Sequence, residues 1–123
     1  MNSKLNLVVL RVTDLERSKR FYEALGVALV LEKHGGGPEH YAAADSAAVF
    51  ELYRCGSAPA TSTLRIGFRV SSMAAAMSKL ELLDAAVVSR PSASAWGLRA
   101  VIVDPDGNLV ELVEDSATTI VDI

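Results

Sequence analysis

Two glutamates stand inside segments that otherwise look built for burial, and their chemistry decides what this chain could do. Glu51 lies within AVFELY (48–53), and Glu111 lies within DPDGNLVELVE (104–114). A buried carboxylate is costly unless it is paired or protonated. Such a group can anchor a cationic ligand, and with a raised pKa it can act as a general base. The role of each glutamate therefore depends on the side chains around it.

Two aromatic residues are candidates to stand beside these carboxylates. Side chains alternate between the two faces of a strand, so Tyr53 shares a face with Glu51. Trp96, the only tryptophan, lies in the segment SRPSASAWG (89–97), which we expect to be a loop. It could pack into the dimer or barrel core, or form an aromatic wall of a binding cleft. Aromatic walls combined with acidic groups suit flat, cationic ligands.

Histidine and cysteine supply few further candidates. His34 and His40 flank the glycine-rich stretch HGGGPEH (34–40), which we expect to be the tip of a hairpin. The pair could bind a metal or close over a ligand, although histidines in such a place are usually solvated. Cys55 is the only cysteine, which excludes an internal disulfide. With no GxSxG, HExxH or CxxC motif, the catalytic residues stay unknown.

An internal repeat organises the chain. Residues 7–30 align with residues 65–88 at an offset of 58, which pairs Arg11 with Arg69. Further along the offset becomes 60, and Glu51 then aligns with Glu111 (111 − 51 = 60). A change of two residues is what a loop insertion produces. Repeated units of this kind fold as copies of one structural module.

Each copy contains the same order of expected elements. Bulky and β-branched residues predict a first strand, and a polar cap followed by apolar residues at helical spacing predicts a helix. In the first copy Thr13 and Glu16 form a capping box, and Gly26 ends the helix. In the second copy Ser71 or Ser72 is the cap. The expected strands are 5–12, 27–33, 39–45 and 47–54 in the first copy, and 63–70, 85–90, 98–104 and 108–114 in the second.

The resulting fold class is α+β, with two tandem βαβββ modules that form a half-open barrel around a cleft. We expect one domain over 1–123, with module one at about 5–54 and module two at about 64–114. Residues 55–63 form the linker and 115–123 a C-terminal tail. If the faces of Glu51 and Glu111 line the cleft, both side chains point into it.

Composition narrows the classes of partner. The net charge of −3 and the pI near 5.3 argue against a nucleic-acid surface, which would be basic. No apolar run reaches the roughly 20 residues that a membrane-crossing helix needs. The first residues, MNSKLNLVVL, lack the layout of a signal peptide. We therefore expect a cytoplasmic protein whose partner is a small molecule.

Three segments resemble one known superfamily: VLRVTDLERSKRFYEALG, FELY and WGLRAVIVDPDGNLVEL. They are similar to the vicinal oxygen chelate (VOC) proteins, also called the glyoxalase/bleomycin resistance/dioxygenase superfamily. The resemblance covers about residues 5 to 114. Its metal-dependent members hold a divalent ion with a His or Gln, a Glu, a His and a Glu from the first, fourth, fifth and eighth strands. The corresponding residues here are Leu7, Glu51, Arg65 and Glu111.

This set departs from the metal-binding pattern. Leu7 and Arg65 offer no lone pair, and a firmly held ion usually needs three or four protein ligands. The sequence therefore predicts no metal and no other cofactor. Our hypothesis is that the Arg65 guanidinium stands where the metal would stand and bonds Glu111, Glu51 or both. The alternative is that Arg65 reaches solvent.

The preferred interpretation is a metal-free small-molecule binding protein of the bleomycin-resistance-like branch, which sequesters a drug or metabolite. Its expected ligand-binding residues are Glu51, Glu111, Arg65, Trp96, Tyr53 and Leu7. The resemblance also implies a homodimer with two clefts. The alternative is an enzyme of lyase, isomerase or dioxygenase type. It would use a non-standard metal site from Glu51, Glu111 and a loop histidine, or one glutamate of raised pKa as general base. A third interpretation is an interaction protein with a vestigial cleft.

Overall fold

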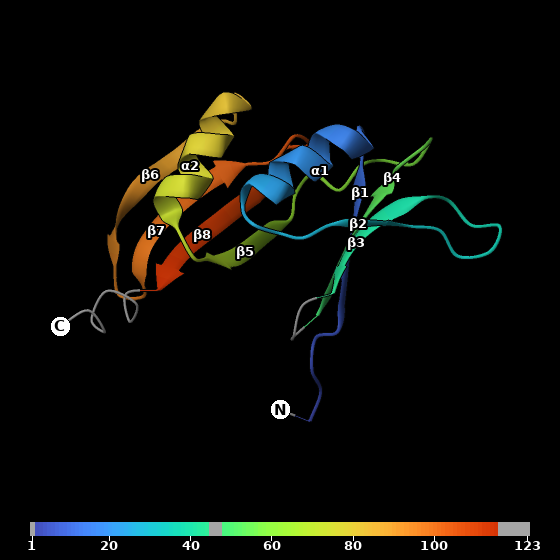
Figure 1. The fold of residues 1–123 in the computed structure, drawn as a ribbon, viewed down its shortest axis with the longest axis horizontal. Helices are drawn as coiled ribbons and strands as arrows, with labels where there is room; N and C mark the ends of the chain where they lie inside the picture. The colour runs from blue at the N-terminus through green and yellow to red at the C-terminus, as the bar shows by residue number, and fades with distance from the viewer. Residues whose placement is uncertain (1, 45–47, 116–123) are drawn as a thin grey trace.

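The computed structural model describes residues 2–44 and 48–115, which form two helices and two four-stranded sheets (Figure 1). The first module contains β1 (Leu7–Val12), α1 (Leu15–Ala24), β2 (Val30–Glu32), β3 (His40–Ala44) and β4 (Val49–Arg54). The second contains β5 (Arg65–Val70), α2 (Met73–Leu82), β6 (Val87–Ser94), β7 (Gly97–Val103) and β8 (Leu109–Asp115). The α+β class and the two tandem modules are confirmed.

The two sheets have the same topology. Their strand orders are β1-β4-β3-β2 and β5-β8-β7-β6, and the first strand of each module pairs in parallel with the last. β1 and β5 begin 58 residues apart, and β4 and β8 begin 60 apart, as the repeat predicts (65 − 7 and 109 − 49). The sheets are not closed into a barrel, since each keeps its own two edges.

Each helix begins at a polar cap. The capping box expected from Thr13 is wrong: Asp14 is the N-cap, and its carboxylate accepts a bond from the Arg17 backbone N–H at 3.1 Å. Glu16 instead accepts a 2.6 Å bond from the Tyr41 hydroxyl on β3, which draws it away from the helix terminus. In the second module Ser72 caps α2, one of the two residues predicted.

The expected loop over 89–97 is mostly strand. β6 runs to Ser94 and pairs with β7 through two register shifts, the second of them between Ser89 and Ser92. Pro91 falls within that shift, and β6 is an edge strand. Proline is tolerated at an edge or a bulge because no ladder hydrogen bond is lost there. A proline and several serines therefore misled the prediction.

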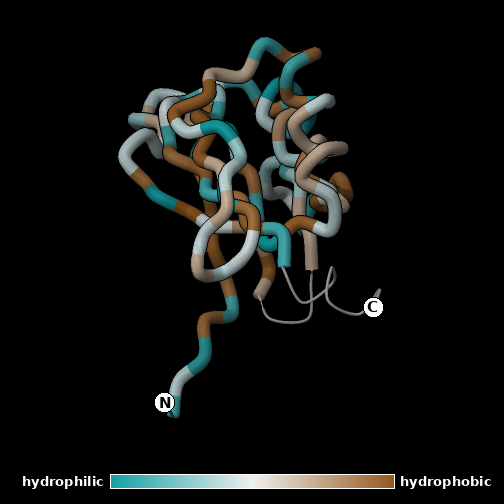
Figure 2. The backbone as a smooth tube through the Cα atoms, turned by 90° about the vertical axis from the view of Figure 1, so that its left-hand side faces the viewer, coloured by the Kyte–Doolittle hydropathy of each residue, from teal (hydrophilic) through white to brown (hydrophobic). Residues whose placement is uncertain are grey.

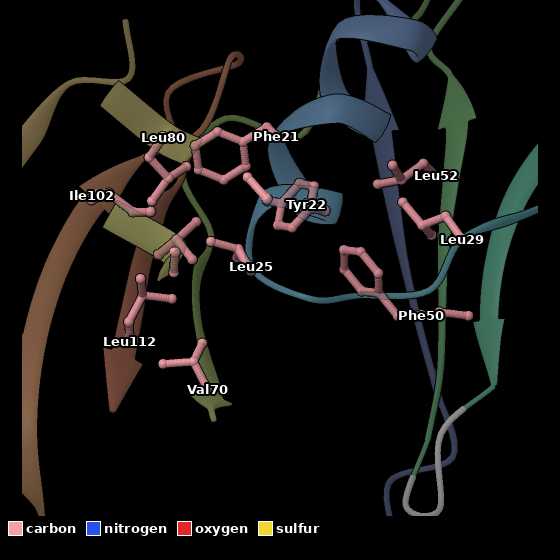
Figure 3. Packing of buried hydrophobic residues seen from close by; sticks show 14 of the residues in the cluster. Phe21, Tyr22, Leu25, Leu29, Phe50, Leu52, Val70, Leu80, Ile102 and Leu112 are labelled. Atoms are coloured by element: carbon pink, nitrogen blue, oxygen red, sulfur yellow. The ribbon is translucent and has the colours of Figure 1, made fainter. Parts of the chain in front are cut away.

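One hydrophobic core serves both modules (Figure 3). Phe21 and Tyr22 of α1, with Leu25 directly after the helix, lie at its centre. Phe50 and Leu52 approach from one sheet, and Val70, Ile102 and Leu112 from the other, together with Leu80 of α2. In Figure 2, hydrophobic stretches run through the body of the chain, while the N-terminal segment extends away from it. Because the core is shared, we treat the two modules as one domain.

The DPDGN turn ties the second module to the first helix. The buried Asp104 accepts a 2.6 Å bond from the Tyr22 hydroxyl and bonds from two backbone N–H groups of its own turn. Burial and the neighbouring Asp104 carboxylate raise the pKa of Tyr22, so its hydroxyl keeps its proton. Asp106 accepts a bond from the Thr13 hydroxyl. The carboxylates of this segment therefore have structural roles at the module junction.

The segments outside the modules are only partly described. The expected linker, 55–63, joins β4 to β5 and returns to the end of β1, where the Thr61 backbone N–H bonds the Arg11 carbonyl at 2.7 Å. The expected tail, 115–123, lies outside the described residues except for Asp115, which ends β8. Within the described chain, no helix has both the length and the apolar character to span a membrane.

Candidate functional site

Glu51 and Glu111 lie on the outer faces of the two sheets. Leu52 and Leu112, the next residue in each case, point into the shared core and are fully buried. Strand alternation therefore turns the glutamates away from that core. We call these surfaces the first glutamate face (the side of β1-β4-β3-β2 that carries Glu51) and the second glutamate face (the side of β5-β8-β7-β6 that carries Glu111). Among the described residues of one chain the two faces do not enclose a common cleft; the sequence left open whether the modules pair within one chain or across two.

The second glutamate face carries a carboxylate held between two guanidinium groups. Glu111 Oε1 accepts bonds from Arg99 Nη2 at 2.6 Å and Nε at 2.9 Å, and from Arg65 Nη2 at 3.2 Å. The Arg99 bonds lower the pKa of Glu111 below its ordinary value of 4.5, and Arg65 adds to this effect, while partial burial opposes it. Glu111 is therefore unsuited to act as a general base near neutral pH, since such a base needs a raised pKa.

The hypothesis about Arg65 agrees with this contact, but the stronger partner is Arg99. The Arg65 side chain is 53% exposed, whereas Arg99 and Glu111 are each 30% exposed. Sequence reasoning missed Arg99 even though a signal was present. In β7, Arg99 alternates with Val101, and Val101 pairs directly with Glu111. Arg99 therefore had to lie on the second glutamate face, diagonal to the carboxylate.

The first glutamate face holds Glu51 beside a ring stack. Glu51 Oε2 lies 3.7 Å from Nε2 of His40, and the Glu51 side chain is 16% exposed. The His40 ring stacks on Tyr53 with 4.2 Å between centroids and 9° between planes. The Arg11 guanidinium carbon lies 4.9 Å from the centre of the Tyr53 ring. Tyr53 therefore shares the face of Glu51, as alternation predicted.

The two histidines of the hairpin differ sharply in exposure. His34 is 73% exposed, in line with a solvated loop residue, but His40 is 1% exposed, so the expectation of solvation is wrong for it. His40 is the first residue of β3, and its Nδ1 lies 3.2 Å from the Pro38 carbonyl oxygen. The Nε2 atom has no hydrogen-bond partner within the described residues. This burial could not be predicted, because the histidine follows a run of turn-forming residues.

Leu7 and Trp96, two further predicted ligand-binding residues, are both open to solvent. Leu7 pairs with Val49 at the start of β1, on the first glutamate face, and is 48% exposed. Trp96 lies at the turn between β6 and β7 and is 67% exposed. Trp96 therefore does not pack into the core of its own chain, while a place in a dimer core stays a prediction. Both side chains are available to a ligand or to a second chain.

An apolar cavity of about 530 Å³ lies on the helix side of the sheets, between the modules. Val8 and Phe50 line it from the first module, and Ile66 and Phe68 from the second. Its volume falls within the range of small-molecule pockets. Neither glutamate lines it, but Val49 and Gly67, which lie on the first and second glutamate faces, do.

Comparison with known proteins now identifies the family. The family model described as "Glyoxalase/Bleomycin resistance protein/Dioxygenase superfamily" matches residues 4–112. The chain belongs to this superfamily. A protein of Mycolicibacterium smegmatis described only as uncharacterized is 32% identical over 106 residues, which is 85% of this chain and 88% of that protein.

Solved structures of superfamily type share the fold. TnmS3, an antibiotic binding protein from Streptomyces sp. CB03234, is 28% identical with a TM-score of 0.69, over 93% of this chain and 97% of that one. A glyoxalase/bleomycin resistance protein from the same organism is 27% identical with a TM-score of 0.67, over 90% and 99%. A glyoxalase-related enzyme from Fulvimarina pelagi is 24% identical with a TM-score of 0.71, over 92% and 88%, which bears on the fold alone.

The four positions that hold the metal in metal-dependent members do not fit a chelate in this chain. We call Leu7, Glu51, Arg65 and Glu111 the chelate positions. Leu7 has no donor atom, and Arg65 donates to Glu111 and so occupies the carboxylate that would bind the ion. Glu51 and Glu111 also lie on different sheets, on outward faces. An enzyme that holds its metal between these two glutamates of one chain is therefore not supported.

Proposed function

We propose that this superfamily member binds a small organic molecule against its glutamate faces, with no metal at the chelate positions, and so sequesters a drug or metabolite. The observation that carries the proposal is the Arg65–Glu111–Arg99 cluster, in which two guanidinium groups occupy the eighth-strand carboxylate. The remaining groups at these faces bind by shape, charge and ring contact. That chemistry suits a binding protein.

The first glutamate face indicates the class of ligand. Glu51 is partly exposed and has no guanidinium partner among the described residues, whereas Glu111 has two. Tyr53 and Leu7 add ring and aliphatic surface on the same side of the sheet. A flat organic cation would pair with Glu51 and pack against Leu7, since the Tyr53 ring is already in contact with His40 and Arg11. The antibiotic-binding relative TnmS3 supports a ligand of drug size.

We further propose that the protein acts as a homodimer. Each glutamate face points outward from the chain, so a cleft with walls on both sides needs a second copy. Leu7 and Val30, both on the first glutamate face, are 48% and 61% exposed, and Trp96 of the second module is 67% exposed. Exposed apolar side chains on these outward surfaces are available for a second copy to cover. Light scattering should give twice the 13.1 kDa mass of one chain.

The cytoplasm is the compartment that we propose for this protein. Cys55 is the single cysteine and is free in the structure. Proteins in a reducing compartment commonly keep such unpaired thiols.

The direct test is a thermal-shift and calorimetric screen with bleomycin, as a cationic glycopeptide, and with a set of aromatic cationic metabolites. We expect at least one compound to stabilise the dimer and to bind about tenfold or more weakly to Glu51→Gln, the loss that corresponds to about 1.4 kcal/mol. Glu81→Gln, at an exposed position of α2, is the matched control and should bind as the wild type does. Equal binding by both variants, or no binding by any compound, would refute the proposal.

A further inference from the structure

We propose that Glu32, His34 and His40 form a binding site for one divalent transition-metal ion, with Zn²⁺ the ion best suited to the donors. None of the three stands at a chelate position. One oxygen or nitrogen of each side chain lies within 4.8 Å of the corresponding atoms of the other two. Two imidazoles and a carboxylate form a donor set typical of zinc sites that keep one coordination position open. This inference is independent of the proposed small-molecule binding.

The hairpin between β2 and β3 brings the three donors together. Glu32 pairs directly with His40 across the antiparallel strands, so both side chains lie on the same face of the sheet. The chain then turns through three glycines, and the Gly37 backbone N–H bonds the His34 carbonyl at 3.0 Å. Gly35 has a φ of 58°, which favours glycine. Figure 1 shows this hairpin projecting from the body of the chain. The turn brings the His34 side chain back beside the Glu32–His40 pair.

The printed distances fit a coordination polyhedron. Glu32 Oε1 lies 3.3 Å from Nε2 of His34 and 3.5 Å from Nε2 of His40. A zinc ion about 2.0–2.1 Å from each ligand atom in a tetrahedron separates those atoms by about 3.3–3.4 Å. The carboxylate oxygen therefore already stands at ligand spacing from both imidazole nitrogens. The exposed His34 ring is free to make the small adjustment that completes the site.

His40 provides the decisive observation, because its buried Nε2 has no hydrogen-bond partner in the part of the chain that the structure describes. The Pro38 carbonyl oxygen can only accept a hydrogen bond, so the proton of the neutral ring must be on Nδ1. That tautomer leaves a lone pair on Nε2, which faces the oxygens of Glu32 and Glu51 at 3.5 and 3.7 Å. Three electron-rich atoms facing one another repel unless a cation stands between them. A backbone carbonyl that fixes the tautomer is also what metal-binding histidines commonly have.

A protonated His40 satisfies this geometry less well. A ring N–H bonded to a carboxylate lies about 2.7–2.9 Å from the oxygen. The observed separations of 3.5 and 3.7 Å are longer, and Nε2 makes no hydrogen bond within the described residues. A buried N–H donor would then stay unsatisfied, which is unfavourable. The negative charges of Glu32 and the neighbouring Glu51 match the two positive charges of the ion instead.

The site has rigid support on one side and an open coordination position. The Tyr53 ring stacks against His40 at 4.2 Å and holds the imidazole plane in place. Three protein ligands leave a fourth position for a water or a ligand atom. Glu51 is the carboxylate closest to that position among the contacts of His40, at 3.7 Å from Nε2. The ion would therefore lie at the border of the first glutamate face.

The experiment uses the full chain with any polyhistidine tag removed, because only two histidines are native. Isothermal titration calorimetry with Zn²⁺ should give one ion per chain. Co²⁺ as a spectroscopic probe should give the intense visible bands of a four-coordinate ion. Mg²⁺ should give neither signal, because it prefers oxygen donors and six-coordinate geometry. Glu32 and His34 are at least 40% exposed, so their variants should fold.

The variants make the assignment specific. His34→Ala and Glu32→Gln should each weaken Zn²⁺ binding by at least about tenfold, since the loss of even an outer-shell partner has an effect of that size. Glu39→Gln, an exposed acid in the same hairpin, should bind as the wild type does. Absence of stoichiometric Zn²⁺ binding, or unchanged binding by both ligand variants, would overturn the inference. Small-molecule binding measured with and without EDTA separates this result from the proposed function.

Discussion

His40 in the first module and Arg99 in the second occupy equivalent positions, and this pair shows how the two copies have diverged. His40 stands two residues before Ala42, the partner of Glu51, and Arg99 stands two residues before the partner of Glu111. Arg99 bonds its glutamate at 2.6 Å, whereas His40 presents an unpartnered nitrogen 3.7 Å from Glu51. One face is thereby neutralised by permanent positive charge, and the other stays acidic.

The same divergence continues across each sheet. Glu32 is paired with His40, while Ser92 is paired with Arg99 at the corresponding place in the second module. The cluster that we propose as a metal site therefore has no counterpart among the described residues of the second copy. The helix-covered faces, in contrast, remain alike, with Leu52 and Leu112 both fully buried in one core. Packing constrains the core of both modules equally, but the outer faces are free to specialise.

The largest expected effect tests whether the two modules contribute equally to the shared core. Leu52→Ala and Leu112→Ala remove matched, fully buried side chains. Each should lower the free energy of unfolding by about 2–5 kcal/mol, because a cavity is left in a shared core. Urea denaturation should show a single transition for both. Two separate transitions, or a large effect in one module alone, would contradict the shared core.

Next in size are the helix caps. Asp14→Ala and Ser72→Ala each remove a side chain that accepts a backbone N–H bond, from Arg17 and from Ala75. We expect each to lower the free energy of unfolding by about 1 kcal/mol. Thr13→Ala tests the corrected cap by a different contact, since Thr13 bonds Asp106. The correction would be wrong if Asp14→Ala had no effect in urea denaturation.

A smaller effect concerns pH and the second glutamate face. The folded-state pKa of Glu111 is lowered from 4.5, chiefly by Arg99, so this carboxylate contributes stability above its unfolded pKa. That contribution is lost as the pH falls through the lowered folded value. The difference in unfolding free energy between wild type and Glu111→Gln should be about 1 kcal/mol at most at pH 7, since the site is partly exposed. It should shrink as the pH falls below 4.5.

Denaturation at several pH values measures this difference. Glu81→Gln, at an exposed position, serves as the control and should show little change over the same range. A difference that grows as the pH falls would mean that Glu111 is destabilised by its surroundings, in conflict with the bonds to Arg99 and Arg65.

The smallest expected effect is at the two hairpin turns. Trp96 is 67% exposed, and a Cβ at Gly36 would have no atom within 4 Å. Trp96→Ala and Gly36→Ala should therefore change the unfolding free energy by no more than about 0.5 kcal/mol. Trp96→Ala should still weaken dimerisation or ligand binding if the proposed function is right. A large stability loss in either variant would show that a turn packs against the core.

The repeat allowed the fold to be predicted from the sequence. Side chains that alternate with a period of two predict the strands, and apolar residues at helical spacing predict the helices. A cap before each helix and Gly26 after the first then set the order of elements in each module. The equivalent of Gly26 in the second module is Asp84 (26 + 58), which adopts a φ of 56° without being glycine. The extent of β6 could not be predicted, because a proline in an edge strand reads as a loop.

The surroundings of the glutamates were harder to predict from the sequence. Alternation placed Glu51, Tyr53 and Glu111 on strand faces. The Arg65–Glu111 contact was one of the alternatives that the resemblance to the superfamily left open. Which way those faces point depends on how two sheets pack around α1 and α2, and no local pattern carries that information. The burial of His40 depends on stacking against Tyr53, a contact between separate strands. Long-range packing of this kind is set by the whole fold.

Crystals grown with Zn²⁺ and measured at its absorption edge test the central claim most directly. The account predicts one anomalous peak per chain, bounded by Glu32, His34 and His40, and no peak among Leu7, Glu51, Arg65 and Glu111, whether from one chain or from two. A zinc ion gripped by Glu51 and Glu111 would contradict the proposed metal-free binding function. No peak at the β2–β3 hairpin would contradict the proposed metal site.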